Sequence, residues 1–368
     1  MPPNRNRYRS QLPKRAMSKQ VLPKIRLSSS LILLARNQDV KPKSFDYNAL
    51  LLTRTPKSSF MPESSVFPGG VCDGTDSSSS WLEHFKRSQI SSAKLQELSQ
   101  VKGPRPEIFK AKADNEGMDP SLSLRLTAIR ETFEELGILL CRDSKSLTST
   151  SGFGQFHEQF DRAHWQHVVH NDASKFLTLC QELEVLPDVW SLHDWSVWRT
   201  PSTFKKRFET AFFVAALEQE PSVHIEPNEV KDCAWRSPLD YLQACLRKEL
   251  WLPPPQFYEL SRCLNFPSLD DLRQFAENRS EKGIDLIHPV MYKCKNGVVH
   301  LLPGDDAYPS DPDASNDKIE TGLSVEDFRS KANGKLHRSE HWNQHQSQLL
   351  INFDRSDGQV HPLDPKKL

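Results

Sequence analysis

Three glutamates within a nine-residue stretch are the residues of this chain best suited to do chemistry. The stretch reads Arg-Glu-Thr-Phe-Glu-Glu-Leu-Gly-Ile over residues 130–138. On a helix, positions i, i+3 and i+4 share one face, so Glu131, Glu134 and Glu135 would stand side by side. Adjacent carboxylates repel each other, whereas Mg²⁺ and Mn²⁺ bind such oxygen ligands, often beside a phosphate. The pattern therefore indicates a divalent-metal site, and a solvated helix face is the alternative.

The same segment carries an apolar stripe that could hold such a helix against a core. Apolar residues step by three and four positions, at Leu126, Ile129, Phe133, Leu136 and Leu140. This spacing is typical of an amphipathic helix, and a glycine at 137 is a common helix stop. We expect a helix over residues 123–140 that buries one face and presents the three carboxylates on the other.

The segment Arg-Glu-x-x-Glu-Glu-x-Gly-aliphatic resembles the second half of the Nudix box. Residues 66–71 (VFPGGV) resemble the strand and loop that open this box. Nudix enzymes hydrolyse a nucleoside diphosphate linked to another moiety. The resemblance implies an α/β fold, the Nudix α/β/α sandwich with a mixed sheet. It also implies that Glu131, Glu134 and Glu135 bind metal, Mg²⁺ or Mn²⁺, with Glu131 and Glu135 the safest of the three.

The two halves of the box lie unusually far apart in this chain. In the family the loop glycine lies 14 residues before the arginine and a glutamate lies 8 before it, but these offsets fall on Glu116 and Leu122 here. Gly70 lies 60 residues before Arg130, so the box is split by about 46 extra residues. Surface loops tolerate such insertions. We expect a surface insertion over about residues 75–118, and the box glutamate is missing.

Several further segments resemble one branch of the family, the animal peroxisomal coenzyme A diphosphatases (Nudix motif 19). They are LLTRTP at 51–56, FMP at 60–62, VFPGG at 66–70, WRTP at 198–201, RFETAFF at 207–213 and LPGDDAY at 302–308. The resemblance runs from about residue 28 to about residue 310. It implies metal-dependent hydrolysis of coenzyme A and acyl-CoA esters to 3′,5′-ADP and 4′-phosphopantetheine or its acylated form.

Other residues receive roles from the resemblance or from their chemistry. Arg130 would orient a neighbouring glutamate through a charged hydrogen bond, whereas an ordinary surface ion pair is the alternative. Gly69 and Gly70 would let the backbone approach the metal or phosphate, or simply form a tight turn. Arg54 suits the phosphates of coenzyme A, because a guanidinium matches phosphate geometry; a solvated arginine at a strand end is the alternative.

A general base outside the helix is expected after the apolar strand at 208–217. Four glutamates follow that strand and remain open as candidates, at Glu218, Glu220, Glu226 and Glu229. Three histidines step by four, at 337, 341 and 345. They could bind a metal from one face of a helix, but a polar tail is the preferred interpretation.

Apolar runs and breakers outline the rest of the chain. Strands are expected at 28–37 and 48–55, one or two helices within 157–183, a helix at 238–247 and two helices within 255–279. Loops with weak strands are expected after about 310. We therefore divide the chain into a basic arm (1–27), a Nudix domain (28–310) and a polar C-terminal extension (311–368).

Composition narrows the class of protein. The 368 residues include 48 basic and 48 acidic side chains, so formal net charge is zero, which gives no support for a stable nucleic-acid partner. No apolar run approaches the ~20 residues that span a bilayer. The seven scattered cysteines favour a reducing compartment. We expect a monomer.

Both ends of the sequence carry possible targeting signals. The first 36 residues hold nine Lys or Arg and no acid, as in a mitochondrial presequence or a disordered basic arm. The sequence finishes Lys-Lys-Leu, which resembles the Ser-Lys-Leu peroxisomal signal apart from its first position. We favour the peroxisome, through an import receptor that reads the C-terminus, with the mitochondrion as the alternative.

The predicted function is therefore that of an enzyme, a coenzyme A and acyl-CoA diphosphatase. A Nudix hydrolase of ADP-ribose, an ADP-sugar or an mRNA cap is the closest alternative. A Nudix-fold binding protein without activity is the alternative from another class, and the intact glutamate set at 131, 134 and 135 argues against it.

Overall fold

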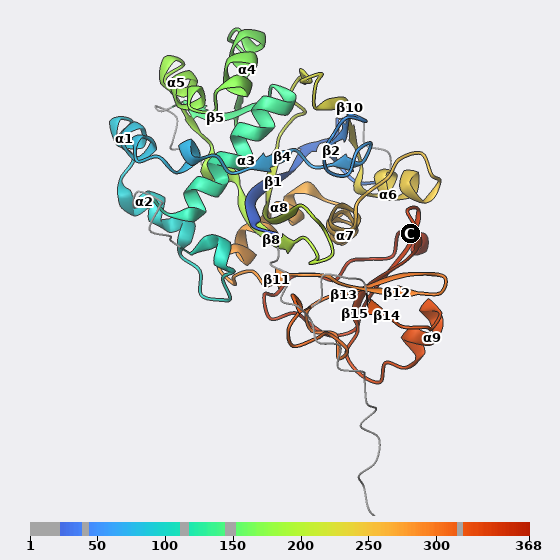
Figure 1. Ribbon diagram of the computed structural model, residues 1–368. Helices are drawn as coiled ribbons and strands as arrows, with labels where there is room; N and C mark the ends of the chain where they lie inside the picture. The colour runs from blue at the N-terminus through green and yellow to red at the C-terminus, as the bar shows by residue number, and fades with distance from the viewer. Residues whose placement is uncertain (1–22, 39–43, 111–117, 144–151, 315–318) are drawn as a thin grey trace, which may run out of the picture.

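A mixed β-sheet forms the centre of the larger part of the molecule. The computed structural model describes residues 23–38, 44–110, 118–143, 152–314 and 319–368 (Figure 1). Strand order is β10–β2–β1–β9–β8–β11, with β3 paired to β2 and β4 to β1. The strands are β1 (Ile25–Arg36), β2 (Tyr47–Arg54), β3 (Ser65–Val66), β4 (Gly69–Val71), β8 (His193–Arg199), β9 (Arg207–Leu217), β10 (Val230–Arg236) and β11 (Leu286–Ile287).

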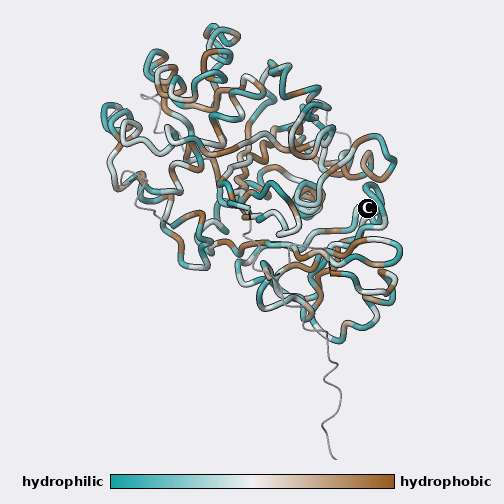
Figure 2. Tube along the Cα trace, in the orientation of Figure 1, coloured by the Kyte–Doolittle hydropathy of each residue, from teal (hydrophilic) through white to brown (hydrophobic). Residues whose placement is uncertain are grey.

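Strand β1 explains why helices must cover both faces of this sheet. Its side chains alternate between two hydrophobic clusters: Leu31 and Leu33 lie in one, Ile32 and Leu34 in the other. The first cluster contains the apolar stripe of α3 (Pro120–Leu136). The second contains residues of α6 (Pro238–Leu246), α7 (Pro254–Cys263) and α8 (Leu269–Ser280). Figure 2 shows hydrophobic segments following the central strands. The predicted α/β/α arrangement with a mixed sheet is confirmed.

The glutamate helix α3 begins and ends for identifiable reasons. Asp119 accepts a hydrogen bond from the backbone N–H of Ser121, and Pro120 occupies the first turn, where its missing N–H costs nothing. Gly137 ends the helix with φ of +65°. The helix thus begins three residues before the predicted range and ends four residues earlier. The chain then continues directly into β5 (Leu139–Asp143).

Most described residues of the long insertion are exposed or half-buried, but a few of its side chains are buried. It contains α1 (Ser80–Arg87), α2 (Ser92–Gln96) and short 3₁₀ turns. Its largest apolar side chains join the same hydrophobic cluster as α3, namely Trp81, Phe85, Leu95, Ile108 and Phe109. The insertion therefore contributes these five side chains to the core, which its expected position as a surface loop did not indicate. The proline-rich, charged composition concealed a few apolar side chains that pack inward.

Two helices and a small sheet lie on the same side of the central sheet as α3. Helices α4 (Arg162–Asn171) and α5 (Lys175–Glu182) occupy the region where one or two helices were predicted. Strands β5, β6 (Phe156–His157) and β7 (Val185–Pro187) pair in a three-stranded sheet. This arrangement places α4 against the carboxylate end of α3.

A second sheet forms the smaller part of the molecule. It contains β12 (Val290–Cys294), β13 (Gly297–Leu301), β14 (Ile319–Glu320), β15 (His337–Asn343) and β16 (Gln346–Ile351), with α9 (Val325–Ser330) alongside. Because β13 pairs with β15, the domain boundary expected near residue 310 falls inside this sheet.

His337 and His341 lie on the strand β15. The alternative interpretation, in which these histidines bind a metal from one face of a helix, is therefore wrong. Among the helices described, none is long and apolar enough to cross a bilayer.

We predict that Phe85→Ala will lower the free energy of unfolding by about 3–5 kcal/mol, because it removes a fully buried aromatic ring. Urea unfolding of the purified variant measures this. Lys86→Ala, at an exposed neighbouring position on the same helix, is the matched control and is expected to change stability by less than about 0.5 kcal/mol. Equal stability of both variants would show that the insertion contributes nothing to the core.

Candidate active site

A buried arginine joins the glutamate helix to the loop that follows β4. Arg130 donates two hydrogen bonds of 2.8 Å to the carboxylate of Asp76, one from Nε and one from Nη2. Asp76 also accepts a 2.8 Å bond from the hydroxyl of Thr127. The side chains of Arg130 and Asp76 are each only 3% exposed. Bidentate charged pairs of this kind fix geometry as well as charge, so Arg130 is not an ordinary surface ion pair.

Asp76 is the residue that the sequence reasoning missed. Counting back from Arg130 suggested that the acidic residue in the middle of the box was missing. In the family that residue lies six positions after the loop glycine, and Asp76 lies six positions after Gly70. The extra residues therefore enter between Asp76 and Arg130, and an aspartate stands where the family has glutamate. Counting forward from Gly70 was the signal that could have found it.

Glu134 is engaged by the same arginine. Arg130 Nη1 donates to Glu134 Oε1 at 2.5 Å and lies 3.0 Å from Glu131 Oε1. The other oxygen of Glu134 lies 3.9 Å from Nδ1 of His170 on α4. Burial raises the pKa of Glu134, while the Arg130 charge acts against that rise. The arginine thus contacts two of the three box glutamates and sets their positions.

The two loop glycines lie against the carboxylates of Glu135 and Glu131. The backbone N–H of Gly69 donates a 2.8 Å hydrogen bond to Oε2 of Glu135. Gly69 has φ of +146°, and a Cβ there would lie 2.3 Å from the carbonyl oxygen of Ser29. A Cβ on Gly70 would lie 2.2 Å from Oε2 of Glu131. Only glycine lets the loop backbone lie this close to the carboxylates.

The positive charge near the carboxylates at this loop does not offset the effect of their burial. Burial raises the pKa of Glu131 to about 8, even though the Arg130 charge acts in the opposite direction. Burial, and then the neighbouring Glu131 carboxylate, raise the pKa of Glu135 well above its ordinary value. A hard divalent cation would remove this penalty, so the oxygen donors at the loop fit such an ion.

The expected three-glutamate ligand set is not assembled in this structure. Within the ranges that the structure describes, no three His, Cys, Asp or Glu side chains converge as a metal-binding group. Glu134 faces Arg130 and Glu135 accepts from Gly69. All seven cysteines, each within the described ranges, are free thiols.

Arg54 lies at the same edge of the sheet, where β2 ends. Its Nε donates a 2.8 Å hydrogen bond to Oγ of Ser58, and its charge acts on Glu135 to lower that carboxyl's pKa. It is half-buried and lines the same cavity as the box glutamates. The structure therefore brings this predicted phosphate-binding residue together with the carboxylates.

Of the four candidate bases, Glu229 alone lines that cavity. Glu218 pairs with Arg36 at 3.2 Å, and Glu220 accepts from Asn48 at 2.7 Å. Glu226 accepts hydrogen bonds from Asn228 and from the backbone of Glu229, closing a turn. The charge of Glu229 contributes to the raised pKa of Glu135, which places the two carboxylates within electrostatic reach of one another.

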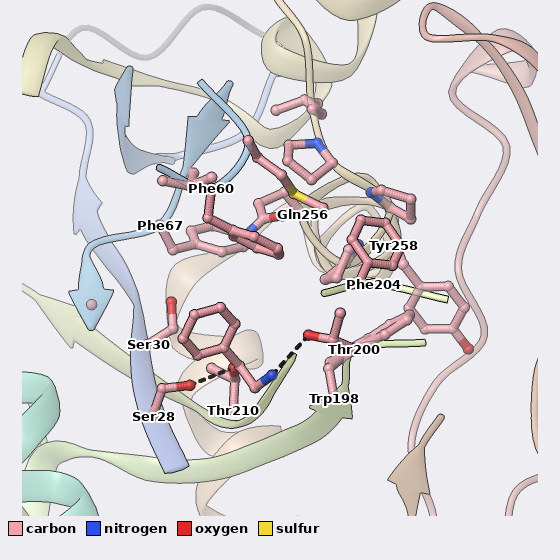
Figure 3. A pocket seen from close by; sticks show the side chains of 18 of the residues that line it. Ser28, Ser30, Phe60, Phe67, Trp198, Thr200, Phe204, Thr210, Gln256 and Tyr258 are labelled. Carbon is pink, nitrogen blue, oxygen red and sulfur yellow. Dashed lines mark hydrogen bonds between the residues drawn. The ribbon is translucent and has the colours of Figure 1, made fainter. Parts of the chain in front are cut away.

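A cavity of about 880 Å³ extends from the carboxylates across the sheet toward the second sheet. Figure 3 shows the hydroxyl groups of Ser28, Ser30 and Thr210 together with several of the aromatic rings that line this cavity. The rings labelled there are Phe60, Phe67, Trp198, Phe204 and Tyr258. Cavities of this size and mixed lining are typical of small-molecule sites. An elongated ligand with a charged part at the glutamates and an apolar part beyond would match this lining.

We predict that Gly70→Ala will abolish the native position of Glu131, because the added methyl would lie 2.2 Å from its carboxylate. Hydrolytic activity is expected to fall at least about tenfold. Gly74→Ala is the matched control, since nothing lies within 4 Å of a Cβ at Gly74. Activity assays, with thermal melting to show that both variants fold, measure the difference. Similar activity in the two variants would contradict the close approach.

Comparisons with known proteins agree with this geometry. Residues 25–263 match the family described as the NUDT19 Nudix domain, and residues 291–352 match the NUDT19 C-terminal domain. The NUDIX hydrolase from Alicyclobacillus acidocaldarius is similar in structure, with a TM-score of 0.51 and 21% identity, over 69% of this chain and 97% of that one. At that identity the likeness shows the fold alone.

Two curated relatives are similar over most of their length. The acyl-coenzyme A diphosphatase NUDT19 of Xenopus laevis is 37% identical over 309 residues, which cover 80% of each chain. Its counterpart from Homo sapiens is 36% identical over 333 residues, which cover 87% of this chain and 88% of that protein. With both domain matches in place, this chain belongs to the NUDT19 family of Nudix hydrolases.

Proposed function

We propose that this chain hydrolyses the diphosphate bond of coenzyme A and acyl-CoA esters. The products would be 3′,5′-ADP and 4′-phosphopantetheine or its acylated form. The observation that carries the proposal is the group of buried carboxylates held against two loop glycines at one end of a long, largely apolar cavity. The names of the relatives, acyl-coenzyme A diphosphatase, support the same substrate class.

The donor set supports Mg²⁺ or Mn²⁺ as the cofactor. Glu131 and Glu135 would hold the ion beside the diphosphate, with Glu134 as the third candidate. A bound divalent ion neutralises phosphate charge and lowers the pKa of bound water. The raised pKa values of Glu131 and Glu135 show that their negative charge is poorly compensated by the protein alone.

The remaining residues position these groups and the substrate. Arg130 holds Glu131 and Glu134 while Asp76 fixes Arg130, so the arginine is a positioning residue. Gly69 directs Glu135 through its backbone N–H. Arg54, within electrostatic reach of Glu135, would bind a phosphate oxygen with its guanidinium. Glu229, exposed at the cavity edge near Glu135, would take the proton from the attacking water.

A substrate panel tests the proposed function. Purified protein is incubated with coenzyme A, acetyl-CoA, octanoyl-CoA, ADP-ribose and a cap analogue, each with Mg²⁺, with Mn²⁺ or with EDTA, and products are separated by chromatography. We expect 3′,5′-ADP from each coenzyme A species, and no turnover in EDTA. Efficient cleavage of ADP-ribose with no turnover of any coenzyme A species would overturn the proposal.

We predict that Glu229→Gln will lower kcat by about 10²-fold or more with little change in KM, because a general base acts in the transition state. Glu220→Gln is the matched control, since Glu220 is exposed and bonded to Asn48 away from the cavity. Steady-state kinetics on coenzyme A with saturating Mg²⁺ measure both variants. A near wild-type kcat for Glu229→Gln would remove this residue from the mechanism.

We further propose that the protein is delivered to peroxisomes by a receptor that reads its C-terminal tripeptide. The side chain of Leu368 is 63% exposed, and Lys366 and Lys367 are also exposed. The basic N-terminal residues 1–22, which bear on the mitochondrial alternative, lie outside the described ranges.

Localisation of an N-terminally tagged protein in cells tests the proposed peroxisomal targeting. We expect peroxisomal signal that becomes diffuse when residues 366–368 are removed, because the receptor requires the free tripeptide. Substitution of the exposed Lys335 by Ala leaves the tripeptide intact and serves as the control. An unchanged distribution after the deletion would favour the N-terminal arm as the targeting signal.

A further inference from the structure

Part of the cavity is lined by three phenylalanines, of which Phe60 contacts the other two. The ring centroids of Phe60 and Phe208 lie 5.1 Å apart, and those of Phe60 and Phe204 lie 6.2 Å apart, in edge-to-face arrangements. All three side chains are half-buried and line the cavity. Phe60 comes from the loop after β2 and Phe204 from the loop before β9, so two separate segments build this surface.

The second sheet supplies further lining of the cavity. Met291 on β12, Val298 on β13 and Trp342 on β15 all line the cavity. The hydroxyl of Thr203 donates to the sulfur of Met291 at 3.0 Å, which joins the loop carrying Phe204 to the second sheet. The cavity is therefore incomplete without the smaller part of the molecule. We call the six residues Phe60, Phe204, Phe208, Met291, Val298 and Trp342 the apolar chamber.

The registers of the strands relate the loop glycines to β9, which carries Phe208 of the apolar chamber, and to β8 beyond it. Gly70 on β4 pairs with Ser29 on β1, Ser28 pairs with Thr210 on β9, and Thr210 pairs with Trp198 on β8. Neighbouring strands lie about 4.8 Å apart, so three steps from β4 to β8 span about 14 Å. This distance suits an extended arm between the diphosphate and a terminal group.

Hydroxyl groups also line the cavity. Ser28 and Ser30 on β1 and Thr210 on β9 lie along it (Figure 3), and the hydroxyls of Ser28 and Thr210 are 2.7 Å apart. Such groups can donate to or accept from the amides of a pantetheine arm. A purely apolar tunnel would leave those amides without partners, at a cost in binding free energy.

Two arginines near the apolar chamber are paired with carboxylates, whereas Lys206, which donates to the carbonyl of Ser59, and Arg26 are exposed. Arg199 donates to Glu209 and lies 3.9 Å from Asp313, and Arg207 donates to Asp313 at 2.6 Å. The guanidinium of Arg26 lies 6.0 Å from the Phe208 ring centre. Because the six side chains that line the apolar chamber carry no charge, an uncharged group suits this surface better than the nucleotide half of the substrate, which brings its 3′-phosphate.

We propose that the apolar chamber binds the S-acyl group of acyl-CoA. The pantetheine arm would cross the hydroxyls of Ser28, Ser30 and Thr210, and the nucleotide would lie on the other side of the carboxylates. This inference rests on the proposed function, which puts the diphosphate at Glu131 and Glu135. It assigns the second sheet a direct role in choosing the acyl chain.

Binding measured without turnover tests the assignment. Dissociation constants for free coenzyme A, acetyl-CoA and octanoyl-CoA are determined by calorimetry in EDTA, for the wild-type protein and for Val298→Trp and Phe204→Ala. Each buried methylene is worth up to about fourfold in affinity. We therefore expect wild-type protein to bind octanoyl-CoA at least about tenfold more tightly than free coenzyme A.

The variants should remove that advantage selectively. Val298→Trp fills the apolar chamber and Phe204→Ala removes one of its walls, so each is expected to weaken octanoyl-CoA binding about tenfold while changing free coenzyme A less than about threefold. Phe45→Ala, which removes a half-buried phenylalanine packed on Tyr47 outside the cavity, is the control. Thermal melting shows that each variant folds.

Three results would overturn the inference. Equal loss for free coenzyme A and octanoyl-CoA would show that the apolar chamber binds the nucleotide. Wild-type affinity independent of chain length would show that the acyl group lies outside the chamber, as would variants that leave octanoyl-CoA binding unchanged. Because binding is read in EDTA, chain-length dependence stands apart from hydrolysis: a panel that finds no diphosphatase activity refutes the proposed function alone.

Discussion

The site depends on one buried guanidinium. Arg130 is bonded to Asp76 from the loop after β4 and to Glu134 on its own helix, and it lies 3.0 Å from Glu131. Burying such a charge is costly unless it is paired, and removing one partner of a buried pair typically costs about 3–5 kcal/mol. The loop and the helix are therefore locked in one relative position. The close approach of Gly69 and Gly70 to the carboxylates follows from that lock.

Buried polar groups on α7 connect the two parts of the molecule, through a bond from Tyr258 to the second sheet. Glu259 on α7, fully buried, accepts from the indole N–H groups of Trp195 and Trp198 and from Arg262. The neighbouring Tyr258 bonds to Nε2 of His337 on β15 at 2.8 Å. The cavity wall contributed by the second sheet is thus anchored through the same helix that covers the central sheet. A shift of one part would leave buried polar groups unpaired.

Local periodicity predicted the elements that have strong patterns of their own. The strands β1, β2 and β9 and the helix α3 lie where alternation and the three-four stripe indicated, because their faces are decided by neighbours in sequence. The inward packing of Trp81 and Phe85 could not be read this way, since isolated apolar residues among polar ones have no clear period. Weak strands were expected after about residue 310, where β14, β15 and β16 lie, but their pairing with β12 and β13 was not, because these partners lie far away along the chain.

The same distinction between local sequence pattern and tertiary contact applies to the residues of the site. Glu131, Glu134, Glu135 and Arg54 could be singled out from residue type and spacing. Choosing Glu229 among four glutamates needed the fold, because all four follow the same strand and only the turn closed by Glu226 decides which one reaches the cavity. Asp76 was missed because the family's spacing was counted back from Arg130, across the insertion. Its identity as the partner of Arg130 is a matter of tertiary contact.

The split of the box also changes how the site must come together during folding. Arg130 and Asp76 are separated by 54 positions instead of the 8 of an uninterrupted box. Closing the longer loop raises the entropic cost by about 1.7 kcal/mol on the simple logarithmic relation. The contact between them has become nonlocal, so the carboxylate cluster cannot form as an independent hairpin-and-helix unit. Formation of the site is then coupled to the packing of α1 and α2 against α3, which share one hydrophobic cluster.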